Sequence, residues 1–265
     1  MTDALIIGAG PAGLMAAETL AEAGHRVVVA EAKPSAGRKF LMAGKSGLNL
    51  TKNEAADPFF AAYGEAENWL EPILQQFHPM DVIEWAEKLG QNVFTGSSGR
   101  VFPQAMKASP LLRAWLERLQ AKNVDIKTGW RWVGGNQFDT DTGRQAIAAE
   151  TTVLALGGAS WARLGSNGHW AKNFVEQGVL LSPFGASNAA ITIDWSDHMS
   201  PYFGTPLKSV SFAAGRYNSR GEAILSKNGL EGGGIYSISR GVREGEDLYV
   251  DLKPDWTLEK VQFAL

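Results

Sequence analysis

The sequence predicts an α/β protein with a Rossmann-like dinucleotide-binding domain in residues 1–185 and a second, mostly β domain in residues 186–265. Three observations support this prediction. A glycine-rich turn, Gly8-Ala9-Gly10-Pro11-Ala12-Gly13, follows an apolar run at the N-terminus. A helical pattern and a second apolar run then end at Glu31, and after about residue 185 the pattern changes to alternating strands. A G-x-G-x-x-G segment alone is weak evidence in a chain with 30 glycines, so the order of the flanking elements carries the prediction.

Each part of the N-terminal motif meets one requirement of a bound dinucleotide. Gly8 allows a tight turn off the strand, Gly10 admits a pyrophosphate to the backbone, and Gly13 lets the helix approach the sheet. The helix begins at Pro11 and Ala12, where free N–H groups and the macrodipole favour negative charge. Glu31, at the end of the second strand, is placed to accept hydrogen bonds from ribose hydroxyls. The alternative to a dinucleotide site is a glycine turn in an ordinary βαβ unit. That alternative does not account for an acid at the end of the second strand.

Apolar periodicity predicts the remaining elements. Helices are predicted over 11–24, over 108–122, over 169–177 and twice within 65–90, separated near His78-Pro79. Strands are predicted over 3–8, 26–31, 124–127, 129–133, 145–149, 189–194, 207–214, 221–226 and 247–252, with a glycine-rich turn at 229–234. Residues 99–103 are expected to form a short strand or a turn. A further apolar strand from Thr151 ends in Ala155-Leu156-Gly157-Gly158, at the sheet edge where ligands bind.

Two stretches carry more specific expectations. Residues 33–53 contain several cations and no acid, and we expect a long functional loop there. A helical stripe of apolar residues between 65 and 90 is expected to belong to the core. It consists of Trp69, Ile73, Leu74, Phe77, Val82, Trp85 and Leu89.

Composition excludes several kinds of protein. The net charge of −3 and the scattered Lys and Arg residues argue against a nucleic-acid partner. The apolar N-terminal stretch is interrupted by Gly and Pro, so we expect no signal peptide, no membrane span and a cytoplasmic location. The chain has no cysteine, and its four histidines lack metal-ligand spacing, so no metal site is predicted. Any electron transfer would then use a bound cofactor directly.

The two glycine-rich strand ends together resemble flavoproteins of the two-dinucleotide-binding type. The segment Gly37-Arg38-Lys39-Phe40-Leu41-Met42-Ala43-Gly44, with Leu48-Asn49-Leu50-Thr51, narrows the resemblance. It resembles the HI0933-like, or BaiN-like, family of FAD-dependent oxidoreductases, which includes aminoacetone oxidase-like proteins. Gly99-Arg100-Val101-Phe102-Pro103 and the stretch 229–236 also fit.

The resemblance implies FAD as cofactor and hydride transfer between the flavin and a small organic substrate or NAD(P)H. Arg38, Lys39, Lys45 and Asn49 are candidates near the flavin ring, against the alternative of a solvated cationic loop. No catalytic residue is identified. The cofactor-binding residues implied are Gly8, Gly10, Pro11, Ala12, Gly13, Glu31, Ala32, Gly37, Arg38, Lys39, Met42, Ala43, Gly44, Leu48, Asn49, Thr51, Trp132, Ala155, Leu156, Gly157 and Gly158.

Other readings stay open at this point. NAD in the first site is disfavoured by the flavin-like later segments, and NADP is disfavoured further because Glu31 would repel a 2′-phosphate, although Lys33 lies near it in sequence. Family members continue into a C-terminal segment that completes the FAD domain, so a non-catalytic nucleotide- or partner-binding remnant is the other alternative. Arg216, Arg220, Arg240 and Arg243 are candidate anion ligands or solvated residues. The substrate, the electron acceptor and the oligomeric state are not specified by these patterns.

Overall fold

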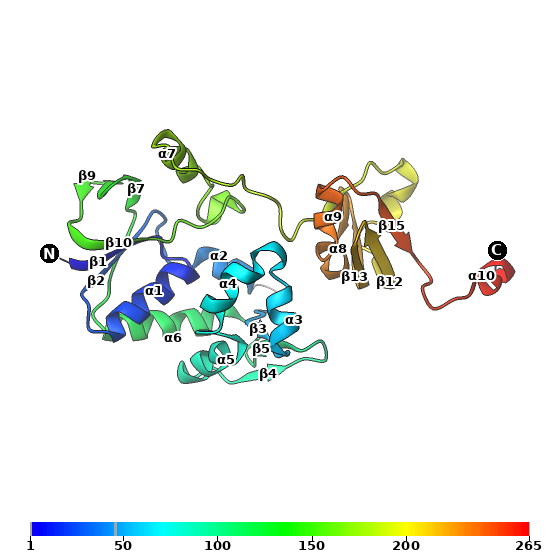
Figure 1. Cartoon of the computed structure of the whole chain (residues 1–265), viewed down its shortest axis with the longest axis horizontal. Coiled ribbons are helices and arrows are strands. Elements are labelled where there is room, and N and C mark those ends of the chain that lie inside the picture. Colours follow the sequence, from blue (N-terminus) through cyan, green and yellow to red (C-terminus); the bar gives the residue numbers. More distant parts are fainter. Residues whose placement is uncertain (1, 45–46, 265) are drawn as a thin grey trace. The chain divides into compact units, whose positions relative to one another are not determined.

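The computed structural model describes residues 2–44 and 47–264. The chain forms two compact units, Met1–Leu181 and Ser182–Leu265, which are described in turn (Figure 1).

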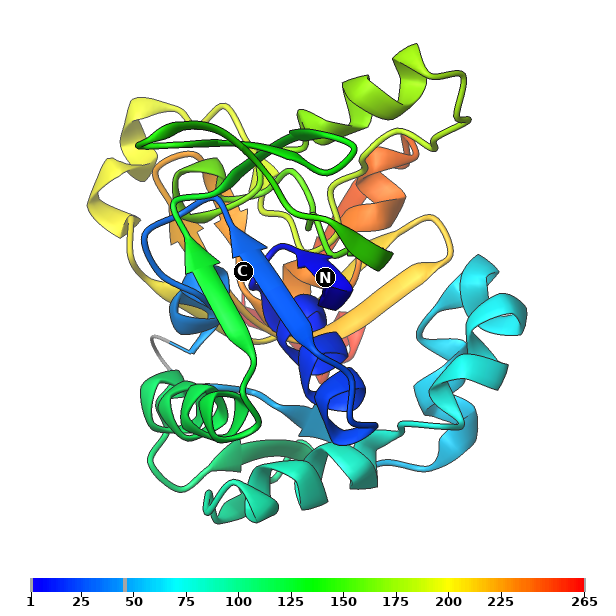
Figure 2. The same ribbon diagram turned by 90° about the vertical axis from the view of Figure 1, so that its left-hand side faces the viewer.

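A four-stranded parallel sheet forms the centre of the first unit. Its strands lie in the order β10-β1-β2-β6, and all three pairings are parallel. Their bounds are β1 (Thr2–Ile7), β2 (Val27–Glu31), β6 (Asp125–Thr128) and β10 (Ala149–Leu154). Helix α1 (Pro11–Glu22) makes the crossover from β1 to β2 and packs on both strands (Figure 2). The predicted Rossmann-like fold is therefore confirmed.

Both faces of the two central strands are covered, which explains why β1 and β2 are almost continuously apolar, whereas the edge strands β6 and β10 carry polar residues. Ile6 and Val29 belong to a core shared with α1 and with helix α6 (Ala108–Ala121). Leu5 and Ile7 point to the other face, where they join a core with Phe138. Phe138 comes from a small antiparallel sheet of β7 (Arg131–Gly134), β8 (Gln137–Thr140) and β9 (Gly143–Ala146). The unit thus has three layers, with helices on one face of the parallel sheet and the small sheet on the other.

A buried carboxylate joins α1 to two other helices. The Glu18 side chain, 5% exposed, accepts hydrogen bonds from Trp85 Nε1 (3.0 Å) and Trp115 Nε1 (2.7 Å). It also forms an ion pair with Arg118, with NH1 2.8 Å from Oε1. A buried charge is tolerated only when it is paired and hydrogen-bonded, and Glu18 has three partners. The contact fixes α1 against α6 and α5 (Pro79–Lys88).

The remaining elements of the first unit correct two predictions, one of a loop and one of a strand. The expected long loop at 33–53 contains a helix and a strand, α2 (Arg38–Ala43) and β3 (Thr51–Lys52), and β3 pairs with β5. The predicted strand at 145–149 is also wrong, because the chain passes there from one sheet to another at Ile147, which is 9% exposed and packs between them. Other elements are α3 (Ala56–Ala61), η1 (Gly64–Ala66), α4 (Glu67–Leu74), β4 (Val93–Thr95), β5 (Arg100–Pro103), η2 (Ala162–Leu164) and α7 (Trp170–Glu176).

The apolar stripe between 65 and 90 is only partly buried, which corrects the expectation of a core. Trp69 is 72% exposed and Ile73 54%, whereas Leu89 is 7% exposed. Helix α4 packs against α3 and η1, both short, so its apolar face is incompletely covered. The helical period was read correctly, but amphipathicity alone does not say how much of a face is covered.

The second unit is built on a five-stranded antiparallel sheet in the order β11-β14-β13-β12-β15. Its core contains Phe212, Ile235 and Ile238. The glycine-rich turn predicted at 229–234 is instead strand β14 followed by helix α8, and Gly229 lets β11 approach so closely that a Cβ would lie 1.9 Å from Ile191 O. The strand predicted at 189–194 shortens to two residues. The elements are β11 (Ile191–Thr192), η3 (Asp197–Tyr202), β12 (Pro206–Ala214), β13 (Tyr217–Ser226), β14 (Gly229–Glu231), α8 (Gly233–Tyr236), α9 (Ser239–Arg243), β15 (Leu248–Asp251) and α10 (Leu258–Ala264).

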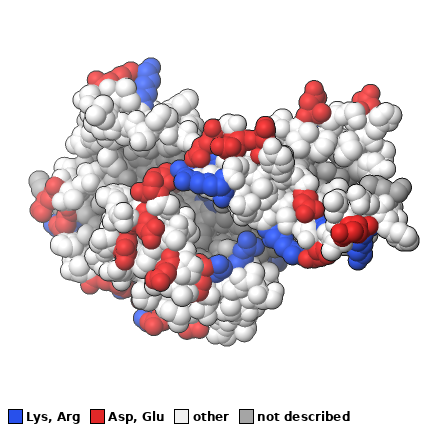
Figure 3. All heavy atoms as spheres, turned by 45° about the vertical axis from the view of Figure 1, so that its right-hand side comes forward, with Lys and Arg blue, Asp and Glu red and all other residues white. Residues whose placement is uncertain are grey.

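Charged side chains of both signs are interspersed on the face drawn in Figure 3, without one sign covering it. Within residues 2–44 and 47–264, no helix has the length and apolar character needed to cross a membrane. The same part of the chain contains no group of three or more His, Asp or Glu residues that could hold a metal ion.

The Glu18 contact yields a stability prediction. Replacing Glu18 with Ala leaves two indole N–H groups and Nη1 of Arg118 without this acceptor, so we expect the free energy of unfolding to fall by about 3–5 kcal/mol. Urea titration followed by tryptophan fluorescence measures this change. Glu84→Ala is the matched control, because Glu84 pairs with Lys88 at the surface and its loss costs at most about 1 kcal/mol. Equal losses in the two variants would contradict a structural role for Glu18.

Candidate functional site

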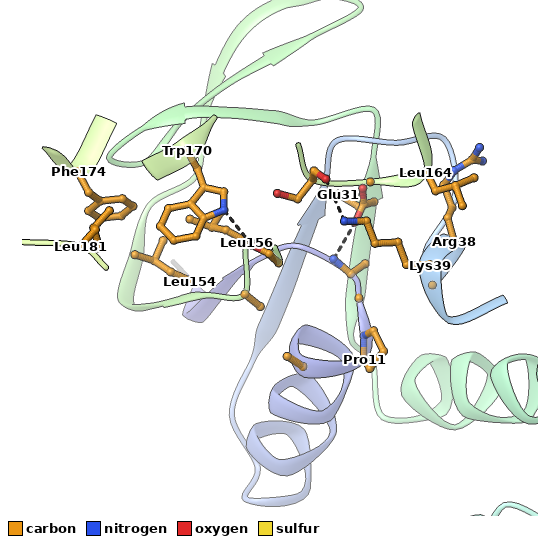
Figure 4. A pocket seen from close by; sticks show the side chains of 18 of the residues that line it. Pro11, Glu31, Arg38, Lys39, Leu154, Leu156, Leu164, Trp170, Phe174 and Leu181 are labelled. Carbon is orange, nitrogen blue, oxygen red and sulfur yellow. Dashed lines mark hydrogen bonds between the residues drawn. The ribbon is translucent and has the colours of Figure 1, made fainter. Parts of the chain in front are cut away.

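A cavity of about 560 Å³ lies in the first unit, at the carboxyl ends of β1, β2 and β10 and at the N-terminus of α1. Ligands bind at this edge in open α/β sheets. Figure 4 shows two kinds of wall, with Arg38 and Lys39 on one side, apolar side chains around Trp170 on the other, and Glu31 between them. The lining residues are Ala9, Gly10, Pro11, Ala12, Glu31, Gly37, Arg38, Lys39, Leu154, Ala155, Leu156, Gly157, Leu164, Gly165, Ser166, Trp170, Phe174, Val179 and Leu181.

The three glycines of the turn are required for different reasons. Gly8 has φ +110°, and a Cβ there would lie 2.3 Å from Ala155 O. A Cβ at Gly13 would lie 1.8 Å from Gly8 O, so only a glycine here allows α1 to pack this close to the end of β1. Gly10 has φ −80°, and a Cβ there meets nothing within 4 Å. Its absent side chain leaves space at the cavity wall rather than relieving a clash.

The N-terminus of α1 presents backbone donors to this space. Gly10 is the N-cap residue and makes no side-chain cap hydrogen bond, and the first helical bond runs from Leu14 N to Gly10 O (2.9 Å). The N–H groups of Ala12 and Gly13 precede that bond, in the turn where a helix has no internal acceptors. The positive end of the macrodipole adds to them, so the position suits a phosphate.

Glu31 is held in place by backbone hydrogen bonds. Ala9 N donates to Oε2 (2.9 Å) and Lys33 N donates to Oε1 (2.8 Å). The carboxylate thereby joins the glycine turn to the chain that leaves β2. Each oxygen keeps a further lone pair, so the ribose contact expected from the sequence remains chemically available.

Arg38 and Lys39 supply positive charge on one wall. The Lys39 ammonium donates to Ser166 O (2.9 Å) and to Gly158 O (3.5 Å), and burial lowers the pKa of Lys39. Arg38 Nε is buried without a hydrogen-bond partner among the described residues. A buried donor in this state is uncommon, and it fits an anionic or polar group entering the cavity.

The opposite wall is apolar and was not anticipated from the sequence. Trp170 and Phe174, on α7, face the cavity with Leu154, which is 46% exposed. Trp170 Nε1 donates to Gly157 O (2.9 Å), which fixes the ring against the end of β10. Trp170 and Phe174 lie four residues apart, a spacing that places two aromatic rings on one face of the predicted helix. That spacing is the signal that could have found them.

A second hollow of about 310 Å³ adjoins the first and shares Glu31 and Trp170 with it. Its walls include Gly8, Ala32 and Trp132. The Trp132 ring stacks on Phe174 with 5.8 Å between ring centroids, so the small sheet and α7 meet at this hollow.

The structure brings thirteen of the expected cofactor residues to these two hollows. They are Gly8, Gly10, Pro11, Ala12, Glu31, Ala32, Gly37, Arg38, Lys39, Trp132, Ala155, Leu156 and Gly157. Eight others line neither hollow, namely Gly13, Met42, Ala43, Gly44, Leu48, Asn49, Thr51 and Gly158. Leu48 packs in the core at 3% exposure, and a Cβ at Gly44 would lie 2.5 Å from Ala108 Cβ. Lys45 lies outside the described residues.

The four arginines of the second unit do not form one cluster of anion ligands. Arg216 and Arg240 lie over the Tyr217 ring, and Arg240 also pairs with Glu244. Arg243 donates to Ala186 O, and Arg220 pairs with Asp255.

A parallel sheet, a glycine turn at the start of the crossover helix and an acid at the end of the next strand define a Rossmann-type protein. The chain belongs to the HI0933-like family: the model of the HI0933-like protein Rossmann domain matches residues 2–239. The family resemblance expected from the sequence is confirmed.

Two curated relatives carry the same name, ribosomal RNA dihydrouridine synthase. The protein from Escherichia coli (strain K12) is 26% identical over 97% of this chain, and the protein from Haemophilus influenzae is 23% identical over 98%. The chain spans 65% and 66% of the length of these relatives.

Solved structures resemble the chain in part. Thermovibrio ammonificans THI4 gives a TM-score of 0.41 at 19% identity, covering 68% of this chain and 64% of that one. A 3-ketosteroid-delta4-(5alpha)-dehydrogenase from Rhodococcus jostii RHA1 gives 0.43 at 15% identity, covering 60% and 46%.

The glycine geometry predicts that two similar substitutions differ in stability. Gly13→Ala places a methyl group into a backbone carbonyl, so we expect it to lower the free energy of unfolding by more than about 2 kcal/mol. Gly10→Ala should change it by less than about 1 kcal/mol, because a weaker N-cap offsets the lower entropy of the unfolded chain. Urea denaturation of both variants checks this. Similar midpoints for the two would show that helix and strand are less closely packed than described.

Proposed function

We propose that the first unit binds FAD and that the protein is an FAD-dependent oxidoreductase, transferring a hydride between the flavin and a small organic substrate or NAD(P)H. One observation carries the proposal: the cavity combines an open glycine turn at a helix N-terminus with an unpaired, buried guanidinium donor. Both features suit the pyrophosphate of a dinucleotide. Membership of the HI0933-like family supports the same class.

The residues of the polar wall have separate tasks in this proposal. The N–H groups of Ala12 and Gly13 bind the pyrophosphate, and Gly10 leaves room for it. Glu31 accepts hydrogen bonds from ribose hydroxyls. Arg38 offers Nε to an anionic oxygen, and Lys39 keeps the loop around Ser166 close to the cavity. The remaining expected contacts that are not packed in the core, at Met42, Ala43, Asn49 and Thr51, are proposed for the flavin side, and Leu48 and Gly44 are proposed to support them from behind.

The apolar wall would exclude water from the reaction. Trp170, Phe174 and Leu181 offer large apolar surfaces, and a dry environment strengthens electrostatic interactions with the cofactor. The bound flavin supplies the hydride chemistry, and the protein supplies binding, orientation and electrostatics. A small-molecule substrate and a cytoplasmic location without a nucleic-acid partner belong to this proposal.

A second candidate is reduction of uridine in RNA. It is favoured by one observation, the similarity over 97% of this chain to a relative named ribosomal RNA dihydrouridine synthase. Forming a dihydrouridine adds a hydride and a proton across a carbon–carbon double bond of the base, as does reduction of a small enone. The net charge of −3 gives little general attraction for RNA, so this candidate requires local contacts.

The cofactor proposal predicts a yellow, flavin-loaded protein. Incubated with FAD and freed of excess ligand, the full chain should show the visible flavin spectrum and release FAD on denaturation. Gly10→Ala should weaken FAD binding roughly 10-fold or more, because the added methyl occupies the space left for the pyrophosphate. Binding is measured by the change in flavin fluorescence on titration.

Gly96→Ala is the matched control for this test. A Cβ at Gly96 makes ordinary contacts at 3.6 Å, and Gly96 lines neither hollow of the candidate site, so its FAD affinity should equal that of the wild type. A wild-type chain that takes up no FAD would contradict the proposal and favour the reading as a nucleotide- or partner-binding remnant.

The substrate class is tested with the reduced, FAD-loaded protein under anaerobic conditions. We expect a small cyclic enone to reoxidise the flavin, since the substrate in the main proposal is a small molecule. The parallel arm offers single-stranded RNA with uridine and the same RNA without uridine, and mass spectrometry measures the gain of two hydrogen atoms per base. Dihydrouridine formation without turnover of the enone would replace the main proposal by the RNA candidate. If the reduced protein reacts with neither the enone nor the RNA, both candidate functions are contradicted.

A further inference from the structure

The second unit has a shallow hollow of about 410 Å³ on its sheet, where β13, β12 and β15 lie side by side (Figure 1). Six of the residues around it point away from the core, namely Ser211, Ala213, Asn218, Arg220, Tyr249 and Asp251. We infer that this hollow binds the base of a nucleotide, stacked against the Tyr249 ring. No residue of this hollow lines the dinucleotide cavity, and the inference does not depend on the bound flavin.

Strand register explains why the hollow exists. Ala213 of the middle strand β12 pairs with Asn218 on one side and with Tyr249 on the other. Two residues earlier, Ser211 pairs with Arg220 and with Asp251. Since side chains alternate along a strand, these two rows lie on the same face of the sheet. Small residues on the middle strand form the floor, and larger side chains on both neighbours form the walls.

The chemistry of the walls suits a flat ring with polar edges. Tyr249 is 67% exposed, so an aromatic face is available for stacking. The Asn218 amide donates and accepts, the Ser211 hydroxyl does both, and the Asp251 carboxylate accepts. A nucleobase presents donors and acceptors on its edge and a π-face above and below. Proteins commonly bind unpaired bases by stacking them on aromatic side chains.

The charges around the hollow favour the base over the phosphate. Arg220 is paired with Asp255, and Asp251 adds a second negative charge nearby. One positive and two negative groups give this site a formal charge of about −1, which disfavours a phosphate in the hollow itself. An uncharged heteroaromatic ring is therefore the better ligand. The base could come from a free nucleotide or from a single-stranded RNA.

Calorimetric titration of the full chain, saturated with FAD, tests the inference. The probes are UMP and ribose 5-phosphate, which share the sugar and phosphate and differ in the base. We expect UMP to bind and ribose 5-phosphate to bind at least about 10-fold more weakly. Tyr249→Ala should weaken UMP binding at least about 5-fold, since stacking is lost, whereas Tyr249→Phe should retain most of the affinity.

Tyr202→Ala is the matched control, because Tyr202 is an exposed tyrosine (56%) of the same unit outside the hollow. Asn218→Ala tests the edge of the base independently of the stacking residue. If UMP binds no better than ribose 5-phosphate, or if Tyr249→Ala binds UMP as tightly as Tyr202→Ala, the inference is overturned. UMP binding in the dinucleotide cavity would be insensitive to Tyr249, so the two sites are distinguished even if FAD does not bind.

Labelled octauridine and a duplex of the same length identify the source of the base. Fluorescence anisotropy should show the single strand binding more tightly than UMP and the duplex binding weakly if the base belongs to RNA, because bases in a duplex are already stacked and paired. Octauridine that binds no more tightly than UMP assigns the site to a free nucleotide. Octauridine binding that survives Tyr249→Ala unchanged would again overturn the inference.

Discussion

The close approach of α1 to the parallel sheet is the constraint on which the candidate site depends. It exists because two glycines leave out the Cβ atoms that would collide, Gly13 with Gly8 O and Gly8 with Ala155 O. These close approaches bring the ends of three strands together. Gly8 follows β1 and lies against Ala155, which follows β10, and Gly8 N donates a hydrogen bond to Ala30 O of β2 (2.8 Å). The helix N-terminus consequently faces the cavity instead of the core.

The same helix is fixed at its other end by charge rather than by close packing. Glu18 lies about two turns beyond the glycine turn and receives hydrogen bonds from α5 and α6. Side chains around α1 thus determine the angle at which its first turn meets the cavity. Small errors in such an angle matter because ligand donors must be positioned to within fractions of an ångström. The binding end and the buried carboxylate belong to one rigid element.

Sequence reasoning succeeded where a local rule dictates a local structure. The parallel core and the division of helices at His78-Pro79 follow from period and capping, and Asp81 completes the cap by accepting from His78 N (2.8 Å). It failed where distant chain segments decide. Trp69 lies in an amphipathic helix, but few elements pack against that helix and the side chain stays exposed. Gly229 allows two strands to approach each other and does not form a turn. The apolar cavity wall around Trp170 forms only where α7 meets the end of β10. The strand that contains Tyr249 could be predicted from the sequence, but the strand with which it pairs could not.

The two backbone hydrogen bonds to Glu31 have a kinetic consequence. Ala9 N and Lys33 N already hold the carboxylate and the turn around it before any ligand arrives. A ligand that meets an ordered turn loses little affinity to the entropy of ordering it, and association needs no slow rearrangement of this segment. The turn is therefore preorganised for binding. Differences in affinity among nucleotides should appear in their dissociation rates rather than in their association rates.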